Sequence, residues 1–124
     1  MTTTAPSRRV GLFGGAFDPP HTAHVALVNA AVTQLALDEL RVLPTGHAWH
    51  KTRTLSPVAH RLAMAHLAFA GLDRVVLDDR ETRRSGPSYT VDTLREIQLE
   101  QPGADLFLVI GEDQARALTT WHEW

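Results

Sequence analysis

The feature that most constrains the fold is the regular alternation of short apolar runs with longer stretches in which apolar residues recur at helical spacing. Strand-like runs occupy residues 10–13, 40–43, 75–77 and 106–110. Between them lie helical stripes formed by Val25, Val28, Val32 and Leu35 and by Val58, Leu62, Ala65, Phe69 and Leu72. This order predicts an α/β Rossmann-like domain: a mostly parallel sheet with right-handed crossovers and helices on both faces.

Cap residues set the expected boundaries of the helices. The first helix is predicted over residues 22–37, and Ser56 is predicted to cap the second, with proline as the first helical residue. Thr90 is the expected N-cap of a third helix that ends near residue 99, and Asp113 could cap a short last helix.

Composition narrows the class of protein. The 124 residues, of which 44% are hydrophobic and 21% charged, suit one globular domain, predicted over residues 9–124 after a flexible tail of residues 1–8. Twelve basic against fourteen acidic residues exclude a strongly basic nucleic-acid surface but not a small phosphorylated ligand. The lack of cysteine excludes disulfide scaffolds and thiol catalysis. Neither a signal peptide nor a membrane span is apparent, and a cytoplasmic location is expected.

Polar motifs follow three of the predicted strands, at residues 14–24, 45–51 and 111–113. Because the carboxyl ends of parallel strands meet at one edge of the sheet, ligands in such folds bind there, near the point where the strand order reverses. The sequence therefore predicts a ligand site built from these motifs.

The first motif suits a phosphate chain. Gly14 and Gly15 would let backbone N–H groups approach a ligand, and His21 and His24 would share a face in the first turn of a helix. The spacing is neither that of a P-loop nor that of the dinucleotide fingerprint. On residue types alone, a tight turn followed by two surface histidines explains it as well. A protein-built metal site is not expected, although His21 and His24, and also His47 and His50, are pairs of equal spacing.

The remaining polar residues have both structural and functional interpretations. Thr90 could cap a helix or bind a polar group there, and Trp121 could belong to the core or stack on an aromatic ligand. Arg61 could contact phosphate, but a solvated charge on the second helix is the favoured interpretation. The charged run at residues 78–84 is most simply a solvated loop.

Together, the motifs resemble the nucleotidylyltransferase superfamily and, within it, the nicotinate-nucleotide adenylyltransferases. The Gly-Gly-x-Phe-Asp-Pro-x-His-x-x-His pattern at residues 14–24 marks the superfamily. The Pro-Ser-Tyr-Thr-x-Asp-Thr run at residues 87–93 and the Gly-x-Asp…Trp pattern at residues 111–121 point to the nicotinate branch, as does the loop from Pro44 to Lys51.

The resemblance implies transfer of AMP from ATP to nicotinate mononucleotide, which gives nicotinate adenine dinucleotide and pyrophosphate. It implies that His21 and His24 are catalytic and that Mg²⁺ is held mainly by ATP phosphates. The residues implied in ATP binding are Gly14, Gly15, Phe17, His21, His24, Gly111 and Asp113. Those implied in binding the nicotinate nucleotide are Lys51, Thr90 and Trp121. A homo-oligomer is left open.

The sequence departs from the family pattern at three places. Ala23 stands where the superfamily usually has glycine, and Ala16 where a hydroxyl residue is common. Family members also continue well past Trp124, so the chain resembles an N-terminal portion of the enzyme. The alternatives are a phosphopantetheine adenylyltransferase, a nucleotide-binding module without activity, and a purely structural domain.

Overall fold

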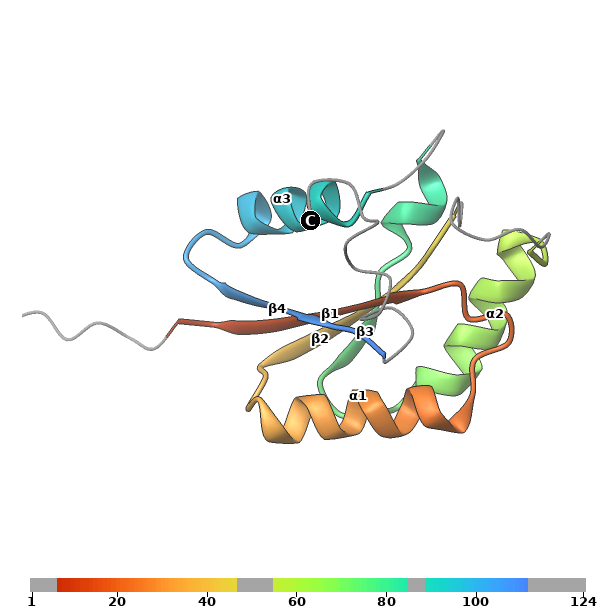
Figure 1. The fold of residues 1–124 in the computed structure, drawn as a ribbon, viewed down its shortest axis with the longest axis horizontal. Helices are drawn as coiled ribbons and strands as arrows, with labels where there is room; N and C mark the ends of the chain where they lie inside the picture. Colours follow the sequence, from red (N-terminus) through yellow and green to blue (C-terminus); the bar gives the residue numbers. More distant parts are fainter. Residues whose placement is uncertain (1–6, 47–54, 85–88, 112–124) are drawn as a thin grey trace, which may run out of the picture.

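The computed structural model describes residues 7–46, 55–84 and 89–111, which form a single sheet with helices packed on both of its faces (Figure 1). In chain order the elements are β1 (Arg9–Gly15), α1 (Thr22–Gln34), β2 (Glu39–Pro44), α2 (Val58–Phe69), β3 (Val75–Leu77), the 3₁₀ helix η1 (Arg80–Arg83), α3 (Thr90–Glu100) and β4 (Asp105–Val109). The expected strands and helices within this part are all present. The expected last helix at Asp113 and most of the expected tail lie outside the described residues.

The four described strands are parallel and run in the order β3-β2-β1-β4. Phe13 of β1 is paired with Val42 of β2 on one side and with Val109 of β4 on the other. The chain therefore moves outward from β1 through β2 to β3 and returns to the opposite side of β1 with β4. The predicted reversal of strand order falls between β1 and β4, and the predicted parallel α/β architecture is confirmed.

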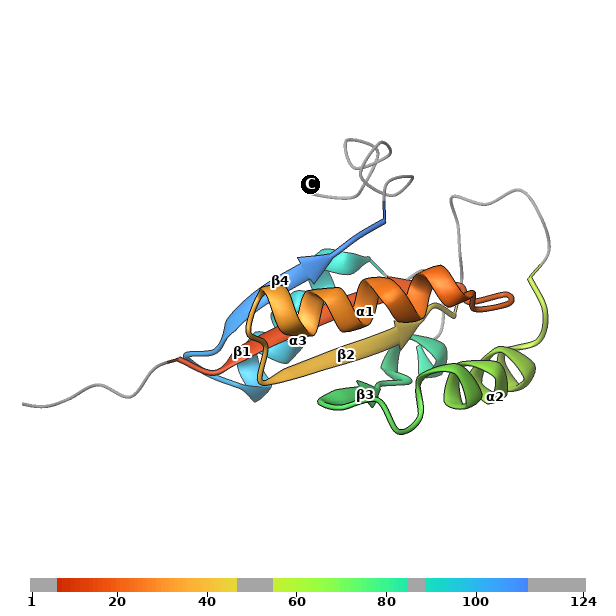
Figure 2. The ribbon, with the colours of Figure 1, turned by 90° about the horizontal axis from the view of Figure 1, so that it is seen from below.

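Alternating side chains of β1 reach two cores, one on each face of the sheet. Phe13 packs in the larger core with Val28 of α1 and Ala65 of α2, whereas Leu12 packs in the smaller core with Ile97 of α3. In Figure 1, α3 accordingly lies on one side of the strands, and α1 and α2 lie on the other. Figure 2 shows α1 running alongside the strands, with α2 near β3. None of the described helices is both long and apolar enough to cross a bilayer.

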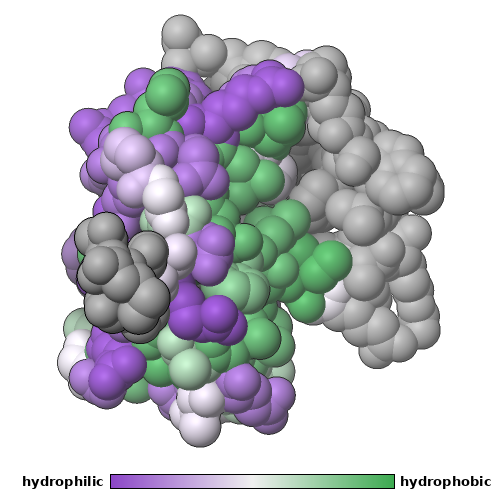
Figure 3. Space-filling model, turned by 90° about the vertical axis from the view of Figure 1, so that its left-hand side faces the viewer, coloured by the Kyte–Doolittle hydropathy of each residue, from purple (hydrophilic) through white to green (hydrophobic). Residues whose placement is uncertain are grey.

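The end of the molecule where the strands begin carries a largely hydrophilic surface with a band of hydrophobic residues between the polar parts (Figure 3). At this end, the side chain of Arg8 donates hydrogen bonds to Glu39, the first residue of β2, and to Gln101, the residue after α3. The described part of the motif at residues 14–24 lies at the other end, where the strands finish.

Three predicted helix boundaries were wrong by one to three residues. Tyr89, not Thr90, is the N-cap of α3, because the carbonyl of Tyr89 accepts the first helical hydrogen bonds. Pro57, not Ser56, precedes α2 as its N-cap. Helix α1 ends at Gln34 because the backbone of Ala36 turns left-handed, with a φ of 49°.

Two residues of α3 test this arrangement. Ile97 is fully buried against the sheet, whereas Leu99 on the same helix is 81% exposed. We expect Ile97→Ala to lower the free energy of unfolding by about 3 kcal/mol through loss of burial and formation of a cavity. The matched Leu99→Ala variant should change it by at most about 0.5 kcal/mol. Urea unfolding measures both values, and equal losses would contradict the packing described for α3.

Candidate functional site

The candidate site lies at the carboxyl ends of β1 and β4, where the strand order reverses. Phe13 is paired with Val109, the last residue of β4, so Gly15 ends β1 two residues beyond this pair and Gly111 follows the end of β4. The motif after β1 and the glycine after β4 thus follow neighbouring parallel strands at the edge where the sequence predicts a ligand site.

The glycines at this edge differ in the space around them. A methyl group at Gly14 would make only an ordinary contact, 3.6 Å from the carbonyl oxygen of Leu43. At Gly111 it would have no described atom within 4 Å. At Gly15 it would meet the ring of Phe17 at 3.2 Å. Packing of the described residues therefore leaves room at Gly14 and Gly111, while the space at Gly15 admits an aromatic ring of the protein itself.

Phe17 anchors the loop between β1 and α1 in the larger core. Its side chain is 3% exposed, and its ring makes edge contacts with Phe13 and Phe69 at centroid distances of 5.5 and 5.4 Å. The backbone of Phe17 is left-handed, with a φ of 50°. A ligand in this site could therefore contact the backbone of Phe17 but not its buried ring.

His21 and His24 come together at the start of α1, as predicted, with ring centroids 5.4 Å apart. His21 is exposed, and His24 is half-buried with its ring edge-on to Phe17 at 5.2 Å. The backbone N–H of His21 donates to Nδ1 of His24 at 2.9 Å. Since Nδ1 is the acceptor, the proton of the neutral ring is assigned to Nε2.

The electrostatics of the pair favour a neutral His24. Burial lowers the pKa of His24, and the neighbouring His21 lowers it further. At neutral pH the Nε2–H of His24 is thus an uncharged hydrogen-bond donor. It lies at a helix N-terminus, where backbone N–H groups and the helix dipole favour anions.

Arg61 is the largest difference from expectation at this edge, because it is buried and not a solvated charge. Its side chain is 1% exposed, and its guanidinium donates to carbonyl oxygens of the loops around the site. Burial lowers the pKa of Arg61, and the charge of Asp18 partly offsets this. The sequence contained a signal, since Arg61 precedes Ala65 and Phe69 by four and eight residues and so shares their buried face.

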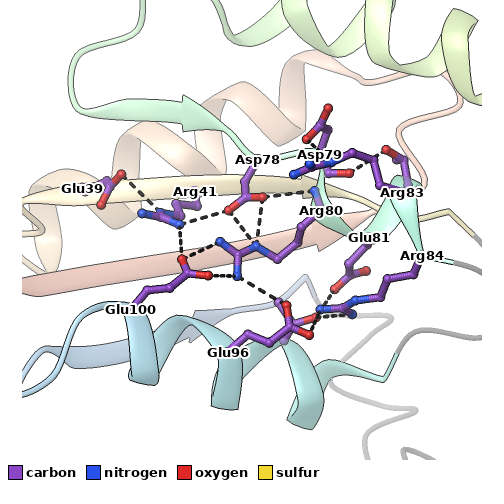
Figure 4. A network of polar contacts seen from close by, with 12 residues as sticks. Glu39, Arg41, Asp78, Asp79, Arg80, Glu81, Arg83, Arg84, Glu96 and Glu100 are labelled. Carbon is purple, nitrogen blue, oxygen red and sulfur yellow. Dashed lines mark hydrogen bonds and ion pairs between the residues drawn. The ribbon is translucent and has the colours of Figure 1, made fainter.

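Residues 78–84, expected to be a solvated loop, form η1 and a network of ion pairs with α3 and β2 (Figure 4). Arg80 makes two hydrogen bonds to Glu100, each of 2.8 Å, and both Arg80 and Arg41 pair with Asp78 at 3.1 Å. The correction has a tertiary cause: η1 packs against β2, and its Arg80 pairs with acidic side chains of α3.

A second part of this network holds η1 against the beginning of α3. The hydroxyl of Thr93 donates to Glu81 at 2.7 Å and accepts from Arg84 at 2.8 Å, and Arg84 also pairs with Glu96 at 2.6 Å. Burial raises the pKa of Glu81. These contacts fix the first turns of α3, which begins at Thr90, relative to η1.

Gly46 connects the loop after β2 to the same 3₁₀ helix. A methyl group at Gly46 would lie 2.5 Å from the carbonyl oxygen of Glu81, so the two backbones pack directly on each other. The other predicted site residues, Lys51, Asp113 and Trp121, lie outside the described residues, as do His47 and His50. Within the part that the structure describes, no three His, Asp or Glu side chains cluster as metal ligands.

Fold and site together define the class: a Rossmann-like α/β protein with a candidate anion-binding edge at the reversal of its strand order. The chain belongs to the cytidylyltransferase-like family, whose sequence model matches residues 12–124.

Individual relatives agree with this assignment. A protein of Albidiferax ferrireducens named "Probable nicotinate-nucleotide adenylyltransferase" is 68% identical over 117 residues, which are 94% of this chain and 59% of that protein. A protein of the same name from Methylibium petroleiphilum is 55% identical over 97% of this chain and 57% of its own length. The chain thus spans somewhat more than half the length of these relatives.

Among solved structures, nicotinic acid mononucleotide adenylyltransferase of Plasmodium falciparum complexed with NaAD has a similar fold. The TM-score is 0.81 at 20% identity, over 94% of this chain and 58% of that one. At this low identity the similarity shows the fold alone.

The ion pairs of Asp78 should make stability depend on pH. Burial by itself would raise the pKa of Asp78, but hydrogen bonds and charges from Arg80 and Arg41 outweigh burial and lower it. The stabilisation is therefore complete above the unfolded value of about 4 and is lost as the pH falls through the lower folded value.

We expect Asp78→Asn to lower the free energy of unfolding by about 2 kcal/mol at pH 6, with the difference from wild type shrinking toward pH 3. Asp73, whose side chain is 91% exposed, provides the control variant Asp73→Asn, which should have little effect at any pH. Urea unfolding across this pH range measures the effect, and a difference that grows on acidification would contradict the assigned direction.

Proposed function

We propose that the protein transfers the AMP group of ATP to nicotinate mononucleotide and releases pyrophosphate. The observation that carries this proposal is the pairing of His21 and His24 at the N-terminus of α1, the helix that follows β1 and its Gly14-Gly15 end, with the two rings 5.4 Å apart. The names of the relatives supply the substrate, and this phosphate-suited geometry is consistent with it.

The chemistry requires no nucleophile from the protein. A phosphate oxygen of nicotinate mononucleotide forms the new bond to the α-phosphorus of ATP, and the bond from that phosphorus to the bridging oxygen of pyrophosphate breaks. The protein's contribution is then in-line positioning and stabilisation of charge. The Nε2–H of His24, the His21 ring and the N-terminus of α1 would bind the phosphates. Gly14 would permit close approach of the backbone, and Gly15, whose side-chain space Phe17 fills, would contribute its backbone.

The other residues would bind the two ends of the dinucleotide. Gly111 and Asp113 would face the adenosine, and Thr90 and Trp121 would hold the nicotinate ring, with Lys51 contacting phosphate. Mg²⁺ would enter as the MgATP complex, held largely by phosphates and water, and would neutralise phosphate charge. We place the reaction in the cytoplasm, which a cysteine-free chain suits.

Pyrophosphate release tests the proposal directly. The protein is incubated with MgATP and, in parallel, with nicotinate mononucleotide, nicotinamide mononucleotide or phosphopantetheine. We expect release with nicotinate mononucleotide. Release with phosphopantetheine alone would overturn the substrate, and the absence of release with all three would leave a nucleotide-binding module without activity.

His24 provides the sharper test of mechanism. We expect His24→Ala to lower kcat about 100-fold while changing the affinity for nicotinate mononucleotide much less, because its donor acts mainly on charge that develops in the transition state. His66→Ala, at an exposed histidine of α2, is the control and should leave both quantities unchanged. Steady-state kinetics give kcat, and calorimetry gives the affinity. Equal losses in both would argue against a transition-state role.

A further inference from the structure

Arg61 lies in the first turns of α2, outside the motifs that carry the proposed function, yet its guanidinium reaches the loops that form the site. With 1% of its surface exposed, it is the largest fully buried side chain of the described residues. Burying a guanidinium is unfavourable unless its N–H groups are satisfied. The hydrogen-bond partners of the Arg61 guanidinium therefore indicate its structural role.

Those partners are backbone carbonyls of three separate segments. Nε donates to Ser56 at 2.9 Å, ahead of α2, and Nη1 donates to Ala16 at 3.3 Å, in the loop after β1. Nη1 and Nη2 also donate to Thr45 and Gly46, directly after β2. A planar guanidinium can bind several carbonyls in fixed directions, whereas an ammonium group on a flexible stem cannot.

Additional hydrogen bonds connect these segments to the site. The N–H of Thr45 donates to the carbonyl of Gly15 at 2.9 Å, so the residue held by Arg61 in turn holds the end of β1. The N–H of Ser56 donates to Oδ2 of Asp18 at 2.7 Å. The loop of residues 14–18 is thus held at Gly15, Ala16 and Asp18, each of them connected to Arg61 directly or through one residue.

We propose that Arg61 is a positioning residue that fixes the loop of residues 14–18 and the start of the loop after β2 in the geometry that binds phosphate. The identity of the ligand rests on the proposed function, whereas the hydrogen bonds by which Arg61 fixes the two loops do not depend on it. The planar fork, and not the positive charge alone, carries this role. Arg61→Lys should therefore not hold the two loops in this geometry.

The test compares Arg61→Lys with Arg9→Lys. Arg9 also donates to a backbone carbonyl, that of Leu35 at 2.8 Å, and its guanidinium lies 4.5 Å from the ring centroid of Phe107, at the far end of the strands. Circular dichroism first establishes the temperature range in which each variant is folded. Calorimetry then measures the affinity for MgATP, and hydrogen exchange measures amide protection along the chain.

We expect Arg61→Lys to weaken MgATP binding at least about 10-fold. It should also speed exchange at residues 14–18 and 45–46, while Arg9→Lys leaves the affinity and these amides unchanged. Wild-type affinity and protection in folded Arg61→Lys would overturn the proposal, as would the same losses in Arg9→Lys.

A second variant covers the case in which Arg61→Lys does not fold. Asp18→Ala removes the acceptor for Ser56 without touching the core, and it should weaken MgATP binding and loosen residues 14–18 in the same direction. Wild-type behaviour of Asp18→Ala would then overturn the proposal. If the wild-type protein binds no MgATP, the proposed function fails, and hydrogen exchange still decides whether Arg61 holds the loops.

Discussion

The central position of β1, paired in parallel with β2 on one side and β4 on the other, is the constraint on which the rest of the structure depends. Because its neighbours run parallel to it, they must be reached by crossovers, and these place α1 and α2 on one face and α3 on the other. The same pairing puts Gly15 of β1 beside Pro44 of β2 and Phe13 beside Val109, the last residue of β4. The candidate site therefore follows from strand order before any side chain is considered.

One buried charge, Arg61, and a partly buried ion-pair network then fix the loops that strand order only brings near. On the face of α1 and α2, Arg61 holds backbone carbonyls, and on the face of α3, Arg80 and Glu81 hold η1 against the helix. Such groups are expensive to bury, and replacing them with apolar residues could leave stability unchanged. We interpret their contribution as orientation: carbonyl and carboxylate directions restrict the loops more narrowly than apolar contacts do.

The two alanines that depart from the family pattern have different surroundings. Ala16 is buried, and its carbonyl is bound by Arg61, so the loop is held there through its backbone and needs no hydroxyl side chain for that purpose. Ala23 is exposed in the first turn of α1, on the helix end that carries both histidines. Its methyl group therefore has space, and the first turn keeps a good helix former.

The sequence by itself determined the strands, the helices, their order and the motifs at the ends of the strands, because periodicity and turn residues act over a few neighbouring positions. It also predicted that His21 and His24 meet, since residues three apart share a face of a helix. Helical spacing also placed Arg61 on the buried face of α2, although the favoured interpretation was a solvated charge. Only the tertiary structure decided which carbonyls Arg61 binds, that residues 78–84 form ion pairs, and that Phe17 fills the space at Gly15. These outcomes depend on partners up to 45 residues away in the case of Arg61 and up to 20 away for Arg80. The partners of a charged side chain are set by the segments that the fold brings together, and local pattern does not contain that information.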